Sequence, residues 1–512
     1  MSRDRQQYRV ELDTGVGAAT QELPYEEWSA DDVPFRIGLL GDFSGRANRG
    51  VVETGRALAA RRPLRVDRDN VDEIIARLAP ELHLSLGDGR TAVKFAELDD
   101  FHPDRLHERL PAFRALRETR ARAAAPVPLG EIGRQGGRAS TGRAAPSSRN
   151  LLDQILGDVP PPPGGAAAVP PQAEPRASQS DPLTDFVRRA VAPHVVPETA
   201  PAQPERVEEV DQIVGTHLRA VLHQPDFQAL ESAWRALDFL VRRLETDSTL
   251  QIYLIDVSKA ELAADLGSAD GAPSGAHRVL VESSVGTAGG TPWALLVGLY
   301  SFGPASDDVD LLRRLAAIAH DAGAPMIAAA ESRVVGSPSF GSAPDPDDWT
   351  DEEMPEWEAL RRSADARYVG LAAPRFLLRL PYGGPDGEPC DVPGFEELSA
   401  PAAHEEYLWG NSAVLSALLH GEAFASDGWS LRPRLDVRGL PFHLVRADGQ
   451  VTAKPCAEAI LSARAVDRML ECGVMAVQSM KDGDAVRLAR MQSIAHPLAA
   501  LALRNGSADA DR

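Results

Sequence analysis

Residues 123–204 constrain the fold of this 512-residue chain most, because their composition is unlike that of a folded domain. Six arginines and one acidic residue lie within 120–149, among glycine, alanine and serine, and 160–204 holds twelve of the 40 prolines. Such a segment cannot bury enough apolar surface to offset the entropy lost on ordering. We therefore expect a long disordered linker over 123–204 that joins two globular parts, residues 1–122 and 205–512.

Two short amphipathic stretches interrupt the linker. They are "RNLLDQILGD" at 149–158 and "DPLTDFVRRAV" at 181–191, and each places apolar residues at the i, i+3 and i+4 spacing of a helix. Asn150 and Asp181 can serve as helix caps. Two interpretations remain open, namely docking helices for a partner or the first turns of the following domain.

The first part begins with a strand pattern. Tyr8, Val10 and Leu12 alternate with polar residues, as in a half-exposed strand, and a strand at a chain terminus can pair with a neighbouring chain. "FRIGLL" at 35–40 is apolar enough for a buried strand. Farther along, an apolar stripe predicts a helix that Pro111 must either kink or begin.

The second part alternates helices and strands. Pro225 divides two long amphipathic helices, and apolar strand patterns then alternate with helical ones, as in "LQIYLIDV", "WALLVGLYSF" and "PMIAAA". This alternation predicts an α/β fold, with mixed sheets that contain parallel strands and carry flanking helices.

The glycine turn after the 35–40 strand is the first candidate for a ligand site. A phosphate-binding loop needs a lysine and a following Ser or Thr, but "GLLGDFSGRANRG" contains no lysine. Asp42 would also repel a phosphate placed over the turn. We interpret this segment as a structural turn at the end of a strand.

Motifs of catalysis are incomplete. "HEEYLW" has Leu408 where a zinc protease needs its second histidine, and no G-x-S-x-G nucleophile elbow is present. The cysteines Cys390, Cys456 and Cys472 form no C-x-x-C pair. We therefore expect no enzymatic activity, no cofactor and no metal.

Asp365 and Arg367 stand close together before a strand. They could act as acid and base, but such a pair is more often a structural ion pair, either buried or at an interface. The structural ion pair is our prediction.

The net charge of −21 makes nucleic acid an improbable partner. No segment reaches the length of about eighteen apolar residues that a membrane span needs, and the N-terminus lacks the apolar run of a signal peptide. We expect a soluble protein of the cytoplasm that does not insert into membranes; the bacterial cytoplasm is what the resemblance described next implies.

Longer stretches of sequence resemble the two sheath subunits of the type VI secretion system. "YRVELD", "PFRIGLLGDFSG" and "FAELDDFHPDRLHERLPAFRALRETR" are similar to the small subunit, VipA or TssB. "NLLDQIL", "VLHQPDFQALESAWRALDFLV", "PWALLVGLYSF" and "EEYLWGNSAVL" are similar to the large subunit, VipB or TssC. Both sets occur in the order found in the family.

The resemblance implies a contractile-tail-sheath fold and a single chain that fuses both subunits. It implies a helical polymer of this chain around an Hcp inner tube, with baseplate proteins at its end. It also implies strand exchange between protomers through Tyr8, Val10 and Leu12. A ClpV-type AAA+ ATPase would bind the helix that carries Leu151, Leu152, Ile155 and Leu156.

The chain also departs from the family pattern. The large subunit continues beyond the segment equivalent to "ECGVMAVQSMKDGDAVRLARMQSIAHP", whereas this sequence ends in polar "RNGSADADR". An alternative to the self-sufficient protomer is therefore an accessory or regulatory paralogue, which co-assembles with or caps a sheath built with a separate, complete large subunit.

Overall fold

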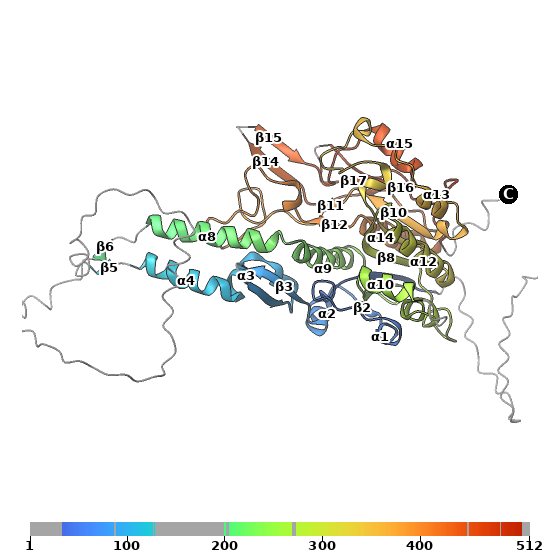
Figure 1. Cartoon of the computed structure of the whole chain (residues 1–512), viewed down its shortest axis with the longest axis horizontal. Coiled ribbons are helices and arrows are strands. Elements are labelled where there is room, and N and C mark those ends of the chain that lie inside the picture. Colours follow the sequence, from blue (N-terminus) through green and yellow to red (C-terminus); the bar gives the residue numbers. More distant parts are fainter. Residues whose placement is uncertain are drawn as a thin grey trace, which may run out of the picture.

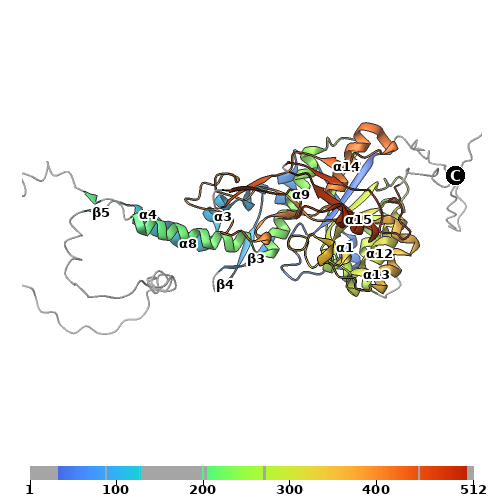
Figure 2. The ribbon, with the colours of Figure 1, turned by 90° about the horizontal axis from the view of Figure 1, so that it is seen from above.

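The computed structural model describes residues 33–86, 89–125, 127–128, 199–200, 204–268, 273–447, 450–481 and 483–503. These residues form a body with a central sheet and an arm of two helices that extends from it (Figures 1 and 2). The predicted strand at Tyr8, Val10 and Leu12 and both amphipathic stretches of the linker lie outside the described residues.

A nine-stranded sheet with the order β13-β17-β16-β10-β9-β8-β1-β7-β2 forms the centre of the body. In chain order its strands are β1 (Phe35–Gly41), β2 (Leu64–Val66), β7 (Leu250–Asp256), β8 (Leu295–Phe302), β9 (Met326–Ala330), β10 (Val369–Ala373), β13 (Asp436–Val437), β16 (Val474–Ser479) and β17 (Val486–Leu488). The run from β7 to β16 is parallel, and β2, β17 and β13 pair antiparallel at the margins. The predicted α/β fold with a mixed sheet is confirmed.

Strand β1 joins the two parts of the sequence. It pairs in parallel with β7 on one side and with β8 on the other, although both of these strands belong to the second part. Phe35, Ile37 and Leu39 enter the core on one face of the sheet, and Leu40 enters the core on the other face. The two parts predicted from the sequence thus share one sheet and both of its cores.

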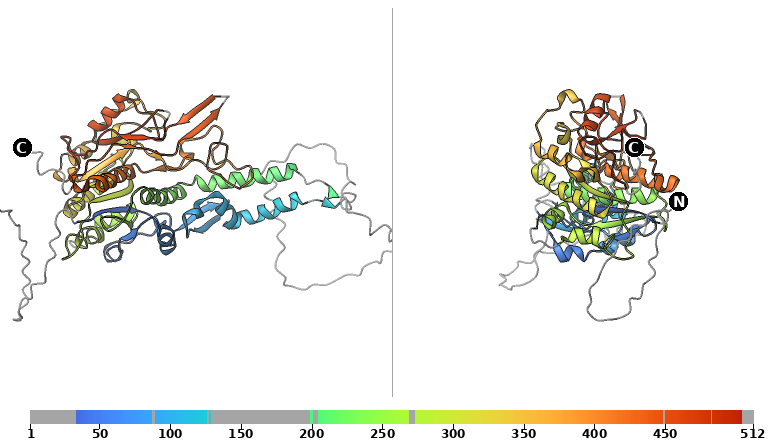
Figure 3. Two further views of the ribbon diagram at one scale, coloured as in Figure 1. Left: turned by 180° about the vertical axis from the view of Figure 1, so that it is seen from behind. Right: turned by 90° about the vertical axis from the view of Figure 1, so that its right-hand side faces the viewer.

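Helices cover both faces of the sheet (Figure 3). The core that contains Phe35 includes α9 (Pro225–Arg243) and α14 (Ala413–Asp427). The opposite core includes α12 (Ser306–Ala322) together with shorter helices. These are α1 (Gly55–Ala59), α10 (Lys259–Gly267), α11 (Gly275–His277), α13 (Pro355–Arg361) and α15 (Ala463–Glu471). No helix in the described ranges is long and apolar enough to cross a membrane.

The arm consists of α4 (Pro111–Ala124) from the first part and α8 (Pro204–Leu222) from the second, which lie side by side (Figure 1). Arg120 of α4 forms an ion pair with Asp211 of α8. Beyond the arm, β5 (Val127–Pro128) pairs with β6 (Thr199–Ala200). Pro111 begins α4 rather than kinking it, and α8 ends before α9 begins at Pro225, as the proline positions predict.

The remaining elements are short. Between β2 and the arm lie α2 (Val71–Leu78), the hairpin of β3 (Glu81–Leu86) and β4 (Gly89–Lys94), and α3 (Pro103–Arg109). β11 (Phe376–Leu377) pairs with β12 (Trp409–Gly410). A second hairpin, β14 (His443–Ala447) and β15 (Gln450–Lys454), projects from the body on the opposite side from α2 (Figure 1).

Candidate functional site

The turn after β1 is where the first part of the sequence is fastened to the second. The carboxylate of Asp256, at the end of β7, accepts hydrogen bonds from the backbone N–H groups of Phe43 and Ser44 at 2.9 and 3.1 Å. The same carboxylate accepts hydrogen bonds from Ser44 Oγ at 2.7 Å and Arg46 Nε at 3.0 Å. The backbone amides that could have held a phosphate therefore bind a carboxylate of the chain itself, which supports the prediction of a structural turn.

Further charges surround this turn. Asp42 accepts hydrogen bonds from the N–H groups of Arg46 and Ala47, while burial raises the pKa of Asp42. Glu261 of α10 is fully buried, yet its pKa is lowered. Burial alone would raise this pKa, but the hydrogen bond from Arg61 and those from backbone N–H groups outweigh burial. Arg61, from the first part of the sequence, thus compensates the negative charge of Glu261, from the second part.

Aromatic packing reinforces the junction. The ring of Phe43 lies edge-on to Trp234 of α9 at 5.1 Å, and Trp234 Nε1 donates to the carbonyl of Phe43 at 2.9 Å. Phe95 stacks on Phe101 at 4.3 Å, and both rings contact Phe227 of α9. All five rings are buried, so each adds a large apolar area to the contact between the two parts.

Amide side chains hold strand β3. Asn48 Oδ1 accepts from the N–H of His83 at 2.6 Å, and Asn48 Nδ2 donates to the carbonyl of His83. Gln224, at the start of α9, bonds in the same way to the N–H and the carbonyl of Ser85, at 3.0 and 3.1 Å. The two side-chain amides thus form the hydrogen bonds that the backbone of a neighbouring strand would otherwise make along this edge of β3.

A buried ionic network lies within the second part. Arg379 Nε donates to Glu231 at 2.8 Å, and Arg379 Nη1 and Nη2 donate to Glu397 at 2.7 and 2.9 Å. Arg235 Nε adds a second bond to Glu231 at 2.6 Å, and Arg235 also donates to the hydroxyl of Tyr382. Burial would raise the pKa of Glu231, but Arg379 and Arg235 hold it below its usual value. Arg379 therefore bridges the two buried glutamates.

The described residues include one cluster that could hold a metal ion, formed by His404, Glu405 and Glu458. Arg375, however, donates to both glutamates at 2.6 to 3.2 Å, and Lys454 Nζ lies 3.3 Å from His404 Nδ1. These two cations already supply the positive charge that a metal would bring. His404 therefore serves as a hydrogen-bond partner of Glu458, at 3.2 Å, in an ionic cluster.

The segment of Asp365 and Arg367 is a turn of 3₁₀-helix, Ala364–Tyr368. Asp365 lies 2.7 Å from His320 Nδ1, and the guanidinium of Arg367 lies over the ring of Tyr368. Within the described chain the two residues therefore have different partners, because side chains two positions apart leave a 3₁₀-helix in different directions. An ion pair of these residues across an interface stays a prediction.

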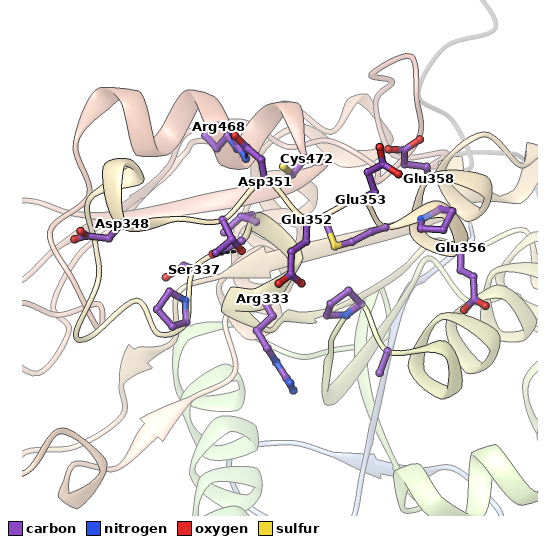
Figure 4. Close-up of a pocket in the computed structure, with 18 residues that line it drawn as sticks. Arg333, Ser337, Asp348, Asp351, Glu352, Glu353, Glu356, Glu358, Arg468 and Cys472 are labelled. Atoms are coloured by element: carbon purple, nitrogen blue, oxygen red, sulfur yellow. Dashed lines mark hydrogen bonds and ion pairs between the residues drawn. The ribbon is translucent and has the colours of Figure 1, made fainter.

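An acidic groove of about 770 Å³ lies between the loop before α13 and helix α15 (Figure 4). Its lining includes Asp351, Glu352 and Glu353, with Arg468 and Cys472 on the α15 side. Arg468 is ion-paired with Asp351. Carboxylates thus line one side of the groove, and one of them pairs with a cation of α15 on the other side.

Comparisons with known proteins identify the family of each of the two joined parts. Residues 204–495, more than half of the chain, match the family described as VipB, tail sheath N-terminal domain. This chain belongs to the VipB tail sheath family. Residues 20–125 match a second family, described as type VI secretion system VipA. The sheath resemblance inferred from the sequence is therefore confirmed.

One relative among characterised sheath proteins is the type VI secretion system sheath protein TssC1 of Pseudomonas aeruginosa. It is 33% identical to this chain over 344 residues, which is 63% of this chain and 69% of the relative. The VipA match ends directly after α4 and the VipB match begins with α8, so each sheath segment supplies one helix of the arm.

Sequence reasoning missed most of the residues that hold the two sheath segments together, and it also missed the buried ionic network within the second part. Asp256 lies 213 positions from Phe43, and Glu231 lies 148 positions from Arg379. The position of Asp256 at the end of an apolar strand was a weak signal, because polar groups often gather at the carboxyl ends of parallel strands. No pattern in the sequence indicated that the side chains of Asn48 and Gln224 bind the backbone of β3.

Proposed function

We propose that this chain is a single-chain protomer of a type VI secretion sheath, which polymerises into a helical tube around an inner tube of the Hcp type. Membership of the VipB family gives it a structural role in the contractile sheath. The observation that carries the proposal is the position of β1, a strand of the VipA-matching segment that lies between β7 and β8 of the VipB-matching segment. The fusion thus provides both subunits in a fixed ratio of one to one.

The contacts between protomers would be strand exchange. The β14–β15 hairpin supports this, because it projects as a two-stranded sheet, and a hairpin of two strands is only marginally stable in water. It is anchored near its base, where Lys454 lies over the rings of Tyr407 and Trp409. A strand from a neighbour, carrying Tyr8, Val10 and Leu12, would complete the sheet.

The finer partners follow from the same proposal. A ClpV-type ATPase would bind Leu151, Leu152, Ile155 and Leu156, baseplate proteins would begin the polymer, and assembly would take place in the bacterial cytoplasm. No cofactor enters the proposal, because contraction would draw on contacts that become more complete as the lattice shortens.

Electron microscopy of the purified full chain tests the proposal. The disruptive variant is Val10→Pro with Leu12→Pro, because proline removes the N–H that a strand ladder needs. The matched control is Val10→Ile with Leu12→Ile, which keeps both N–H groups and the strand propensity. We expect tubes from the wild-type chain and the control, and folded particles without tubes from the proline variant.

A folded wild-type chain that forms no tubes would refute the self-sufficient protomer. Tubes that appear only after addition of a complete large subunit would instead identify the chain as an accessory sheath protein. Tubes from the proline variant would refute strand exchange at this position while leaving the sheath role intact.

A further inference from the structure

The β3–β4 hairpin has one edge that is closed and one that is open. Along β3 the N–H of Glu81 donates to the carbonyl of Ser44, and Asn48 and Gln224 bind the backbone of His83 and Ser85. The outward-facing backbone groups of β3 are therefore already hydrogen-bonded within the molecule, so this edge is closed to another strand. Figure 2 shows the partner strand β4 at the margin of the molecule.

The register of the hairpin determines which backbone groups of β4 point outward. In an antiparallel pair, residues opposite an outward-facing residue also direct their N–H and C=O groups away from the partner strand. Glu81, His83 and Ser85 face outward on β3, and they lie opposite Lys94, Ala92 and Arg90. The side chain of Arg109 donates a hydrogen bond to the carbonyl of Lys94. Within the described residues, the N–H and C=O groups of Arg90 and Ala92 bond to no other part of the protein.

The side chains of β4 specify what could pair with this edge. Arg90, Ala92 and Lys94 share the exposed face, while Val93 is buried on the other. Two copies of this edge placed side by side would bring like charges together, so the basic residues disfavour pairing of β4 with itself. The same residues favour a strand whose exposed face carries carboxylates.

We propose that β4 is a docking edge for an extended acidic segment of a partner protein, which adds to the β3–β4 hairpin as a third strand. Main-chain hydrogen bonds to Arg90 and Ala92 would hold the segment, and acidic side chains beside Arg90 and Lys94 would select it. The chain has a net charge of −21, but charges beyond about 8 Å are screened at physiological salt, so the groups at this edge govern recognition. Lys94 Nζ lies 3.5 Å from the carboxylate of Glu81 on β3, but its side chain is 70% exposed and can contact an added strand together with Arg90. This inference is independent of the proposed sheath function.

A peptide-binding experiment on the full chain tests this proposal. The probe is a fluorescent seven-residue peptide in which glutamate alternates with valine, and the control peptide has lysine in place of glutamate. The disruptive variant is Ala92→Pro, because the N–H at this position points to solvent and its loss breaks no bond within the hairpin. Its matched control is Ala92→Val, which keeps the N–H and suits a strand.

We expect saturable binding of the acidic peptide to the wild-type chain and to Ala92→Val, and binding at least about tenfold weaker to Ala92→Pro. Replacement of Arg90 and Lys94 by glutamate should reverse the preference in favour of the lysine peptide. Hydrogen exchange at the Arg90 and Ala92 amides should slow when the acidic peptide binds.

Failure of the acidic peptide to bind would overturn the proposal, as would equal binding of the two peptides or equal affinity for Ala92→Pro and Ala92→Val. Self-association of the chain that Ala92→Pro abolishes without added peptide would also overturn it, because the edge would then serve contacts between copies of this chain.

Discussion

Glu458 provides the sharpest test of the electrostatic account. Burial would raise its pKa, but hydrogen bonds from His404 and Arg375 and the charge of Arg375 lower it to about 2, against 4.5 for an ordinary glutamate. By linkage, this difference corresponds to about 3 kcal/mol of folding free energy at neutral pH. Because the pKa of the folded state is depressed, this stabilisation is present above pH 4.5 and disappears as the pH falls towards 2.

The perturbation is Glu458→Gln, and Glu405→Gln is its matched control. Both carboxylates bind Arg375, but the side chain of Glu458 is 7% exposed and that of Glu405 is 68% exposed. Urea titrations followed by tryptophan fluorescence should show a loss of about 3 kcal/mol at pH 7 for Glu458→Gln and less than about 1 kcal/mol for Glu405→Gln. The loss for Glu458→Gln should shrink as the pH falls below 4.5. Equal losses in the two variants, or a loss that does not change with pH, would refute this reasoning.

Three further substitutions probe the junction and the core. Arg379→Met should destabilise the protein by about 3–5 kcal/mol, measured by urea titration, because Glu231 and Glu397 lose a buried partner. Asp256→Asn should cost about 1.5–3 kcal/mol and speed hydrogen exchange at the Phe43 and Ser44 amides, because the amide group cannot replace a carboxylate that accepts from four donors. Leu39→Ala should cost about 2–5 kcal/mol in thermal unfolding, because the side chain is fully buried in β1. A near-neutral result for any of them would contradict the contacts described for that residue.

Elements with strong local patterns could be predicted from the sequence. The proline at position 225 separates α8 from α9 as expected, and "FRIGLL" is the buried strand β1. The alternation of helix and strand patterns after residue 250 predicted the parallel strands of the central sheet. These features depend on periodicity and on residues that end or begin helices, which a sequence displays directly.

The position of β1 could not be predicted from such patterns. Nothing local to residues 35–41 indicates that this strand lies between two strands more than 200 positions away. The pairing of Arg379 with Glu231 and Glu397 was hidden for the same reason, since any of the 54 basic residues could have been the partner. Only the resemblance to the two sheath subunits indicated that the two parts of the chain belong to one assembly.

The central claim is that two sheath segments form one protomer through a shared sheet, so that the linker is not needed to hold them together. We would insert a protease site between Gly165 and Ala166, cleave the folded chain, and apply it to a size-exclusion column. The account predicts that both fragments elute together at the position of the uncleaved chain and that the melting temperature is unchanged. Fragments that elute separately without denaturant would contradict it.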